Sequence, residues 1–84
     1  MRKDSKIIWG GKLESNGKFH GENRAIKRNI SEQMIIDAIS NPDRVKVQSI
    51  DCKHYIKTFT REITVVAVAK GNNTFEIITC WGNS

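Results

Sequence analysis

The chain has 84 residues, 38% of them hydrophobic and 27% charged, and its 14 Lys and Arg against 9 Asp and Glu give a formal net charge of +5. This length supports one hydrophobic core, and the composition excludes a disordered tail; two cysteines are too few for a disulfide scaffold. No apolar run approaches the roughly 20 residues that span a bilayer, so no membrane association is expected. A small basic surface favours polyanions through counterion release, and nucleic acid is the expected partner, although a generically basic small protein has the same charge.

Residues 1–15 are predicted to form an extended arm or an edge strand. Ile7-Ile8-Trp9 is a short apolar patch, and two glycines follow it. Ser15-Asn16-Gly17 then gives a turn signal. The start of the chain lacks the long apolar stretch of a signal peptide, and it is also compatible with a piece cut from a longer protein.

A first helix is predicted from about Gly21 or Glu22 to Asn29, with His20 at or just before its start. At about 100° per residue, the segment HGENRAIKR separates into an apolar face and a cationic face that includes an imidazole. Imidazole titrates near neutral pH and guanidinium matches phosphate oxygens, so this face suggests a phosphate-handling site. A solvated surface helix would also carry such cations. The residues of the cationic face are His20, Arg24, Lys27 and Arg28.

A second helix is predicted from Ser31, a good N-cap, to about Ser40. Ile30 can pack on Ile35 as a hydrophobic staple, and Pro42 disfavours helical geometry in the residue before it. The helix is therefore short and buries one apolar stripe.

From Val45 onward the hydrophobic period approaches two, and β-branched residues dominate. The short links between these segments favour an antiparallel meander. Phe75, Ile77, Thr79 and Trp81 are expected to share one face of the last strand. The predicted strands are residues 44–50, 53–60, 63–70 and 74–81.

The predicted fold class is α+β, with two N-terminal helices packed on a four-stranded antiparallel sheet. The chain of residues 1–84 is expected to be a single domain. A bridge between Cys52 and Cys80 is one option, and two free thiols in strands are the other.

The ordered set of motifs resembles small toxin ribonuclease domains of the barnase/EndoU/colicin/RelE-like superfamily, as found at the C-terminal tips of contact-dependent-inhibition and other polymorphic toxins. The likeness covers about His20 to Trp81. It consists of H-x3-R-x3-R-x-I-[ST], a helix that ends in Asn-Pro, and a terminal strand that ends in Ile-Ile-Thr. This chain departs from the pattern by Gly21 directly after the histidine, and by Asn29 where many relatives have Gly; Asn also adopts left-handed geometry.

The resemblance implies a metal-independent ribonuclease without a cofactor, which cleaves RNA by attack of the 2′-hydroxyl and leaves a cyclic phosphate. Carried over by position, it assigns catalytic roles to His20 as general acid or base, to Arg24 and Arg28 as phosphate-stabilising groups, and to Thr79 on the last strand. It further implies a cognate immunity or antitoxin protein, expected to be acidic. The domain would act in the bacterial cytoplasm as the delivered C-terminal part of a secreted or surface-exposed protein.

Four further residues are candidates for substrate binding, and each has an ordinary structural alternative. Lys27 shares the cationic helix face. His54 and Tyr55 alternate faces of one strand, so that one of them would reach the site as an acid, a base or a stacking ring, and Lys57 follows them. The RNA target, whether tRNA, rRNA or message, stays open. The alternative function is a non-catalytic module that binds RNA or DNA on the same basic face.

Overall fold

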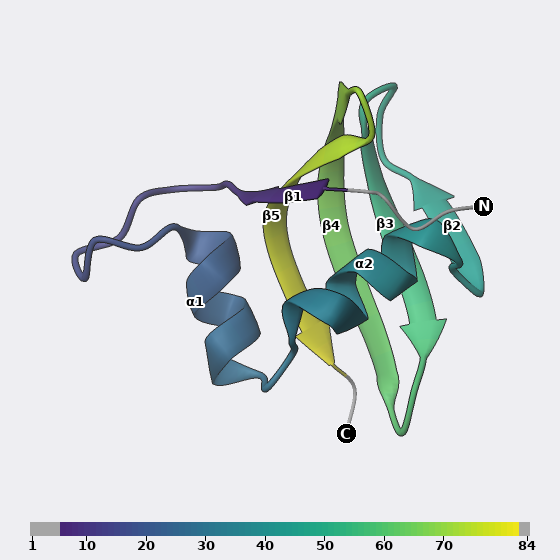
Figure 1. The fold of residues 1–84 in the computed structure, drawn as a ribbon, viewed down its shortest axis with the longest axis horizontal. Helices are drawn as coiled ribbons and strands as arrows, with labels where there is room; N and C mark the ends of the chain where they lie inside the picture. The colour runs from purple at the N-terminus through teal and green to yellow at the C-terminus, as the bar shows by residue number, and fades with distance from the viewer. Residues whose placement is uncertain (1–5, 83–84) are drawn as a thin grey trace.

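The computed structural model describes residues 6–82. Within them, four strands form an antiparallel meander and a fifth strand, the first in the chain, joins one edge in parallel (Figure 1). The spatial order is β1-β5-β4-β3-β2. The elements are β1 (Lys6–Trp9), α1 (His20–Lys27), α2 (Glu32–Ser40), β2 (Arg44–Val47), β3 (Cys52–Thr58), β4 (Glu62–Gly71) and β5 (Thr74–Gly82).

The predicted architecture of two N-terminal helices on a four-stranded antiparallel sheet is therefore wrong. The fold is α+β, but the sheet is mixed and five-stranded, and both helices lie in the middle of the chain. The error concerns β1. Its four residues are too short to show a strand period, and its parallel partner β5 lies at the other end of the sequence. Ile7 and Trp9 pack against the core, so burial of these two side chains favours the pairing.

Helix α2 covers one face of the sheet, in front of β3 and β4 (Figure 1). Its predicted N-cap is confirmed, because the Ser31 hydroxyl accepts a hydrogen bond from the Met34 amide at 3.2 Å. Ile35, Ala38 and Ile39 bury the inner stripe of the helix. They meet the central strand β4, whose residues 63–67 are all buried, and this contact is the hydrophobic core.

A β-bulge changes the faces of β5 relative to the prediction. Ala67 on β4 pairs with Ile77, whereas the preceding Val66 pairs with Thr79, so Ile78 is an extra residue. Ile77 and Cys80 consequently both point into the core and are fully buried. Thr79 alternates with Cys80 and so lies on the opposite face, not on the face of Ile77 as a regular period would place it.

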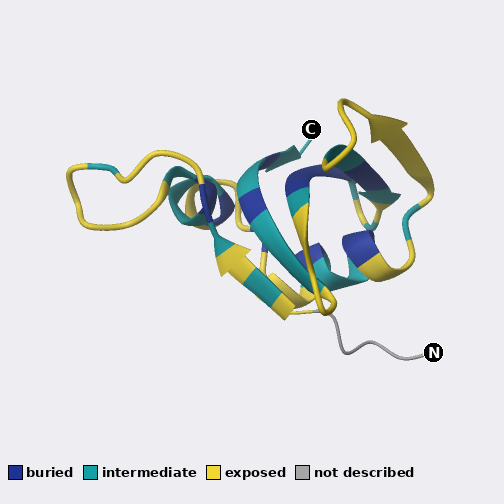
Figure 2. Ribbon diagram, turned by 90° about the horizontal axis from the view of Figure 1, so that it is seen from above, coloured by how far each residue is buried: buried dark blue, intermediate teal, exposed yellow. Residues whose placement is uncertain are grey.

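Strand β2 forms the other edge of the sheet and is exposed along its whole length (Figure 2). It ends at Val47, earlier than predicted, and residues 48–51 form the turn into β3. Arg44 pairs with Glu62 of β4 across the sheet face, and Lys46 lies on the same face of β2 two residues later. Both cysteines are free thiols.

Helix α1 lies beside the half of β5 that β1 does not reach (Figure 1). The chain between β1 and the helix continues the edge: the Gly10 amide donates to the Ile77 carbonyl at 2.8 Å, and the Gly21 amide donates to the Gly10 carbonyl at 3.2 Å. Gly21 is buried against β5, where a Cβ atom would overlap the Ile77 carbonyl oxygen. The absence of a side chain at Gly21 is therefore what lets the helix approach the sheet so closely. None of the helices in residues 6–82 is long and apolar enough to cross a membrane.

Gly21→Ala is expected to lower the free energy of unfolding by about 1–3 kcal/mol, because the added methyl group forces α1 away from β5. Intrinsic helix propensity predicts the opposite, a gain of up to about 1 kcal/mol. Urea unfolding followed by circular dichroism distinguishes the two signs. A variant more stable than the wild type would show that the helix does not depend on this close approach.

Candidate active site

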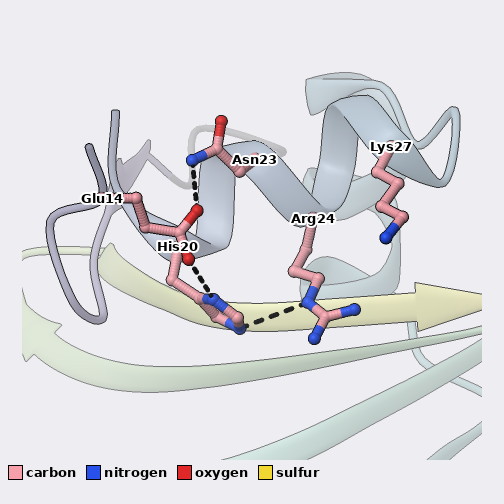
Figure 3. Close-up of a pocket in the computed structure, with 5 residues that line it drawn as sticks. All are labelled: Glu14, His20, Asn23, Arg24 and Lys27. Atoms are coloured by element: carbon pink, nitrogen blue, oxygen red, sulfur yellow. Dashed lines mark hydrogen bonds and ion pairs between the residues drawn. The ribbon is translucent and has the colours of Figure 1, made fainter. Parts of the chain in front are cut away.

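A pocket of about 210 Å³ opens on the surface of α1 and is lined by polar side chains (Figure 3). Four of them come from the helix and one comes from the loop before it. A second hollow, at the junction of α1 and α2, is lined by Ala25, Ile26, Asn29, Ile30 and Ser31 and has no titratable side chain. The residues that line the first pocket are Glu14, His20, Asn23, Arg24 and Lys27.

The pitch of α1 brings three of these side chains together. His20, Arg24 and Lys27 are spaced by four and three residues, so they share one face of the helix. His20 is the first helical residue, and its amide donates to the Lys12 carbonyl at 2.8 Å, which ties the start of the helix to the preceding loop. Arg24 lies between His20 and Lys27 along the pocket (Figure 3).

A short hairpin brings Glu14 to the same pocket. Leu13 pairs with Phe19, and the Glu14 amide donates to the Lys18 carbonyl at 2.9 Å, around the predicted turn at residues 15–17. Gly17 in this turn has a φ of +84°, a conformation that favours glycine. The hairpin folds the chain back so that Glu14 faces the first turn of α1.

His20 is held from both sides of its ring. Nδ1 lies 3.0 Å from Glu14 Oε2, and Nε2 accepts a hydrogen bond from Arg24 Nε at 3.4 Å. A guanidinium can only donate, so Nε2 is the unprotonated nitrogen in this arrangement, and the ring proton is on Nδ1, where it is donated to Glu14. About a third of the His20 side chain, 31%, is exposed, so the ring is held in place and yet is open to a substrate.

Asn23 completes the support of Glu14. Its side-chain amide donates to Glu14 Oε1, and it exchanges two hydrogen bonds with Asn16 in the hairpin, at 2.9 and 3.2 Å. The hydrogen bonds from His20 and Asn23, and to a smaller extent the positive charge of Arg24, hold the pKa of Glu14 below its ordinary value of 4.5, against the opposing effect of desolvation. Glu14 is therefore a carboxylate at neutral pH.

The structure does not bring Arg28 into the pocket. Helix α1 ends at Lys27, and Arg28 is its C-cap, with a φ of −97° and a ψ of 5°. Asn29 follows in the left-handed conformation with a φ of +58°, as its residue type allows. The backbone carbonyl of Arg28 accepts a hydrogen bond from Arg61, so this residue joins the helix end to the turn between β3 and β4.

The other predicted site residues also lie outside the pocket lining. Tyr55 is buried in the core with its ring edge-on to Phe75 at 6.1 Å, and this burial raises its pKa. Lys57 donates from Nζ to the Asn41 carbonyl at 3.0 Å, at the end of α2. Two residues lie on the sheet face opposite the core: Thr79, and His54, whose ring is edge-on to Trp81 at 6.0 Å.

Glu14 and Asn23 are the site residues that sequence reasoning missed. A helical period cannot reveal Glu14, because it precedes the helix and reaches His20 only through the hairpin. The turn at residues 15–17 was the available signal, since a tight turn between Glu14 and Lys18 must return the chain to the helix start. Asn23 falls on the same helix face as His20 and Lys27, at steps of three and four.

The described part of the chain shows no group of three His, Cys, Asp or Glu side chains that could hold a metal ion. Burial raises the pKa of the Cys80 thiol to about 11, so it is protonated and unreactive at neutral pH. Comparisons with protein-family models, with curated protein sequences and with solved structures find no match to this chain. The assignment of this pocket as a candidate active site therefore rests on the geometry of its residues.

Glu14→Gln is expected to change how stability depends on pH. Because the folded pKa of Glu14 is below 4.5, its carboxylate stabilises the fold above about pH 5, and this contribution is lost as the pH falls through the folded pKa. The difference in free energy of unfolding between wild type and variant should be present at neutral pH and shrink in acid. Urea unfolding from pH 3 to 7 measures it, with Glu22→Gln on α1 as control. A difference that is unchanged in acid would contradict the inferred hydrogen bonds.

Proposed function

We propose that the protein is a metal-independent endoribonuclease whose active site is the pocket on α1. The observation that supports this most directly is the arrangement of His20, a neutral imidazole in this geometry, beside Arg24 and Lys27. A proton acceptor next to two cations is what cleavage of RNA through its own 2′-hydroxyl requires, because the nucleophile belongs to the substrate.

In the proposed reaction, His20 Nε2 takes the proton of the 2′-hydroxyl. The 2′ oxygen forms a bond to phosphorus, and the bond from phosphorus to the 5′ oxygen breaks. The products are a 2′,3′-cyclic phosphate and a 5′-hydroxyl end. Arg24 stabilises the charge that develops on the non-bridging oxygens, since its guanidinium can donate two parallel hydrogen bonds to them.

The departing 5′ oxygen needs a proton from the side opposite the attacking oxygen. The ammonium group of Lys27 can donate this proton. Lys27 lies beyond Arg24 as seen from His20 (Figure 3), and its seven-residue separation from His20 corresponds to about 10 Å along the helix axis. A phosphate bound at Arg24 would thus have an acceptor on one side and an ammonium donor on the other. Solvent then restores the protonation of both groups.

Substrate must displace the hydrogen bond from Arg24 to His20. That bond is long, at 3.4 Å, and joins a cation to a neutral ring, whereas a phosphate oxygen offers the guanidinium a charged acceptor. Binding of the phosphodiester therefore frees the Nε2 lone pair for the 2′-hydroxyl. The net charge of +5 favours this encounter with a polyanion.

The toxin role and the inhibitor are part of the proposal and rest on the resemblance in the motifs of α1, α2 and β5. An acidic immunity or antitoxin protein that covers the pocket would suit the charge of the chain, and opposite charges would speed its association. The proposed place of action is the bacterial cytoplasm, after delivery as part of a larger secreted or surface protein.

Incubation of the purified protein with total bacterial RNA in EDTA tests the reaction. The expected products end in 2′,3′-cyclic phosphates, and an RNA with 2′-deoxyribose at the cleaved position stays intact because it lacks the nucleophile. RNA that is bound but recovered whole would favour the alternative, a non-catalytic binding module.

His20→Ala should lower kcat by at least about 100-fold, because the proton acceptor is lost. Arg24→Ala should lower kcat by a similar factor, since it removes stabilisation from the transition state. His54→Ala is the matched control: it removes the other imidazole, which lies against Trp81 outside the pocket, and it should keep kcat near the wild-type value. Equal losses at His20 and His54 would place the active site elsewhere.

A further inference from the structure

Glu14 contacts the ring nitrogen of His20 that faces away from Arg24. Its Oε2 lies 3.0 Å from Nδ1, and its other oxygen, Oε1, accepts a hydrogen bond from Asn23 (Figure 3). Both carboxylate oxygens are thus engaged by the protein. In this geometry Glu14 is turned toward the histidine and the asparagine, and the reacting phosphate would lie on the Arg24 side of the ring.

The contacts of Glu14 and Arg24 with the His20 ring favour the same tautomer. A neutral imidazole carries one proton, and in free histidine this proton prefers Nε2. Glu14 offers an acceptor to a proton on Nδ1, and Arg24 offers a donor to a bare Nε2. Together they invert the ordinary preference.

We propose, on the assumption that the pocket is the ribonuclease site described above, that Glu14 is a positioning residue. It keeps the His20 proton on Nδ1 and leaves Nε2 as the atom that takes the proton of the 2′-hydroxyl. When Nε2 accepts that proton, the carboxylate also stabilises the positive charge of the ring.

The hairpin gives this contact the rigidity that a positioning role needs. Asn23 is held by two hydrogen bonds to Asn16, and the Asn16 side chain also accepts from the Lys18 amide at 3.0 Å. Glu14 is thereby fixed from the turn on one side and from α1 on the other. A carboxylate on a free loop would lose side-chain entropy each time it oriented the ring.

The state of the ring can be measured in the free protein, without RNA. Nitrogen chemical shifts from two-dimensional NMR report which imidazole nitrogen carries the proton, and a His54→Asn variant assigns the two histidines. The wild type should show His20 protonated on Nδ1. Glu14→Ala, which removes the acceptor of the Nδ1 proton, should move this proton toward Nε2, whereas Glu22→Ala, which removes a carboxylate of α1 outside the pocket lining, should leave it on Nδ1.

The same variants are then tested on RNA. Glu14→Ala should lower kcat by about 100-fold or more, with KM nearly unchanged because the residue does not touch substrate. Asn23→Ala, which leaves Glu14 in place but removes its support, should give a smaller loss in kcat and a partial move of the proton. It also serves as the second variant if Glu14→Ala does not fold, which circular dichroism reports.

Each outcome decides the proposal. A proton that stays on Nδ1 in Glu14→Ala overturns it, whatever the activity; if kcat also falls, Glu14 has a direct role in the reaction. A proton that moves while kcat stays at the wild-type value overturns it as well. Failure of the wild type to cleave any RNA removes the ribonuclease function, while the NMR result still shows separately whether Glu14 sets the tautomer.

Discussion

The close approach of α1 to β5 at Gly21 is the contact on which the arrangement of the pocket depends. Here the helix meets the backbone of β5 directly, and the Gly10 and Gly21 amides extend the hydrogen bonding of the sheet edge to the first turn of the helix. His20 precedes Gly21 and is therefore fixed by the same contact. A side chain at position 21 would overlap the Ile77 carbonyl oxygen, so the first turn of α1 would have to shift, and His20 with it.

The pocket combines two kinds of local structure. The helical pitch aligns His20, Arg24 and Lys27, and it would do so in any helix of this sequence. The hairpin supplies the negative charge, which pairs with the imidazole on the side away from the arginine. Cations alone on this face would bind an anion without distinguishing the two nitrogens of the ring. The added carboxylate makes one of them a proton acceptor.

The sequence predicts the elements well where the signals are local. Both helices and the Ser31 cap follow from propensity and capping, and the spacing of His20, Arg24 and Lys27 predicts their shared face. The failure in the architecture is non-local. The parallel pairing of β1 depends on β5 at the far end of the chain.

The missed details have a different origin, in single residues and one turn. One extra residue at Ile78 reverses the expected face of Thr79, because a strand has a period of two and a single insertion shifts it. Arg28 is the C-cap of α1 and lies outside the pocket lining, although its four-residue step from Arg24 predicted a shared site. Glu14 reaches the site only through the geometry of a turn. Period and composition contain none of this information.

The exposed edge at β2 bears on whether copies of the protein can extend one another's sheets. In a symmetric antiparallel pair of β2 strands, partners opposite each other must lie on the same face, so even-numbered positions meet even-numbered ones. When the strands overlap at their centres, Lys46 faces Lys46, or Arg44 faces Lys46, and like charges directly opposite are destabilising. The two cations on alternate residues of β2 thus disfavour the strand-to-strand aggregation that an unpaired sheet edge otherwise allows.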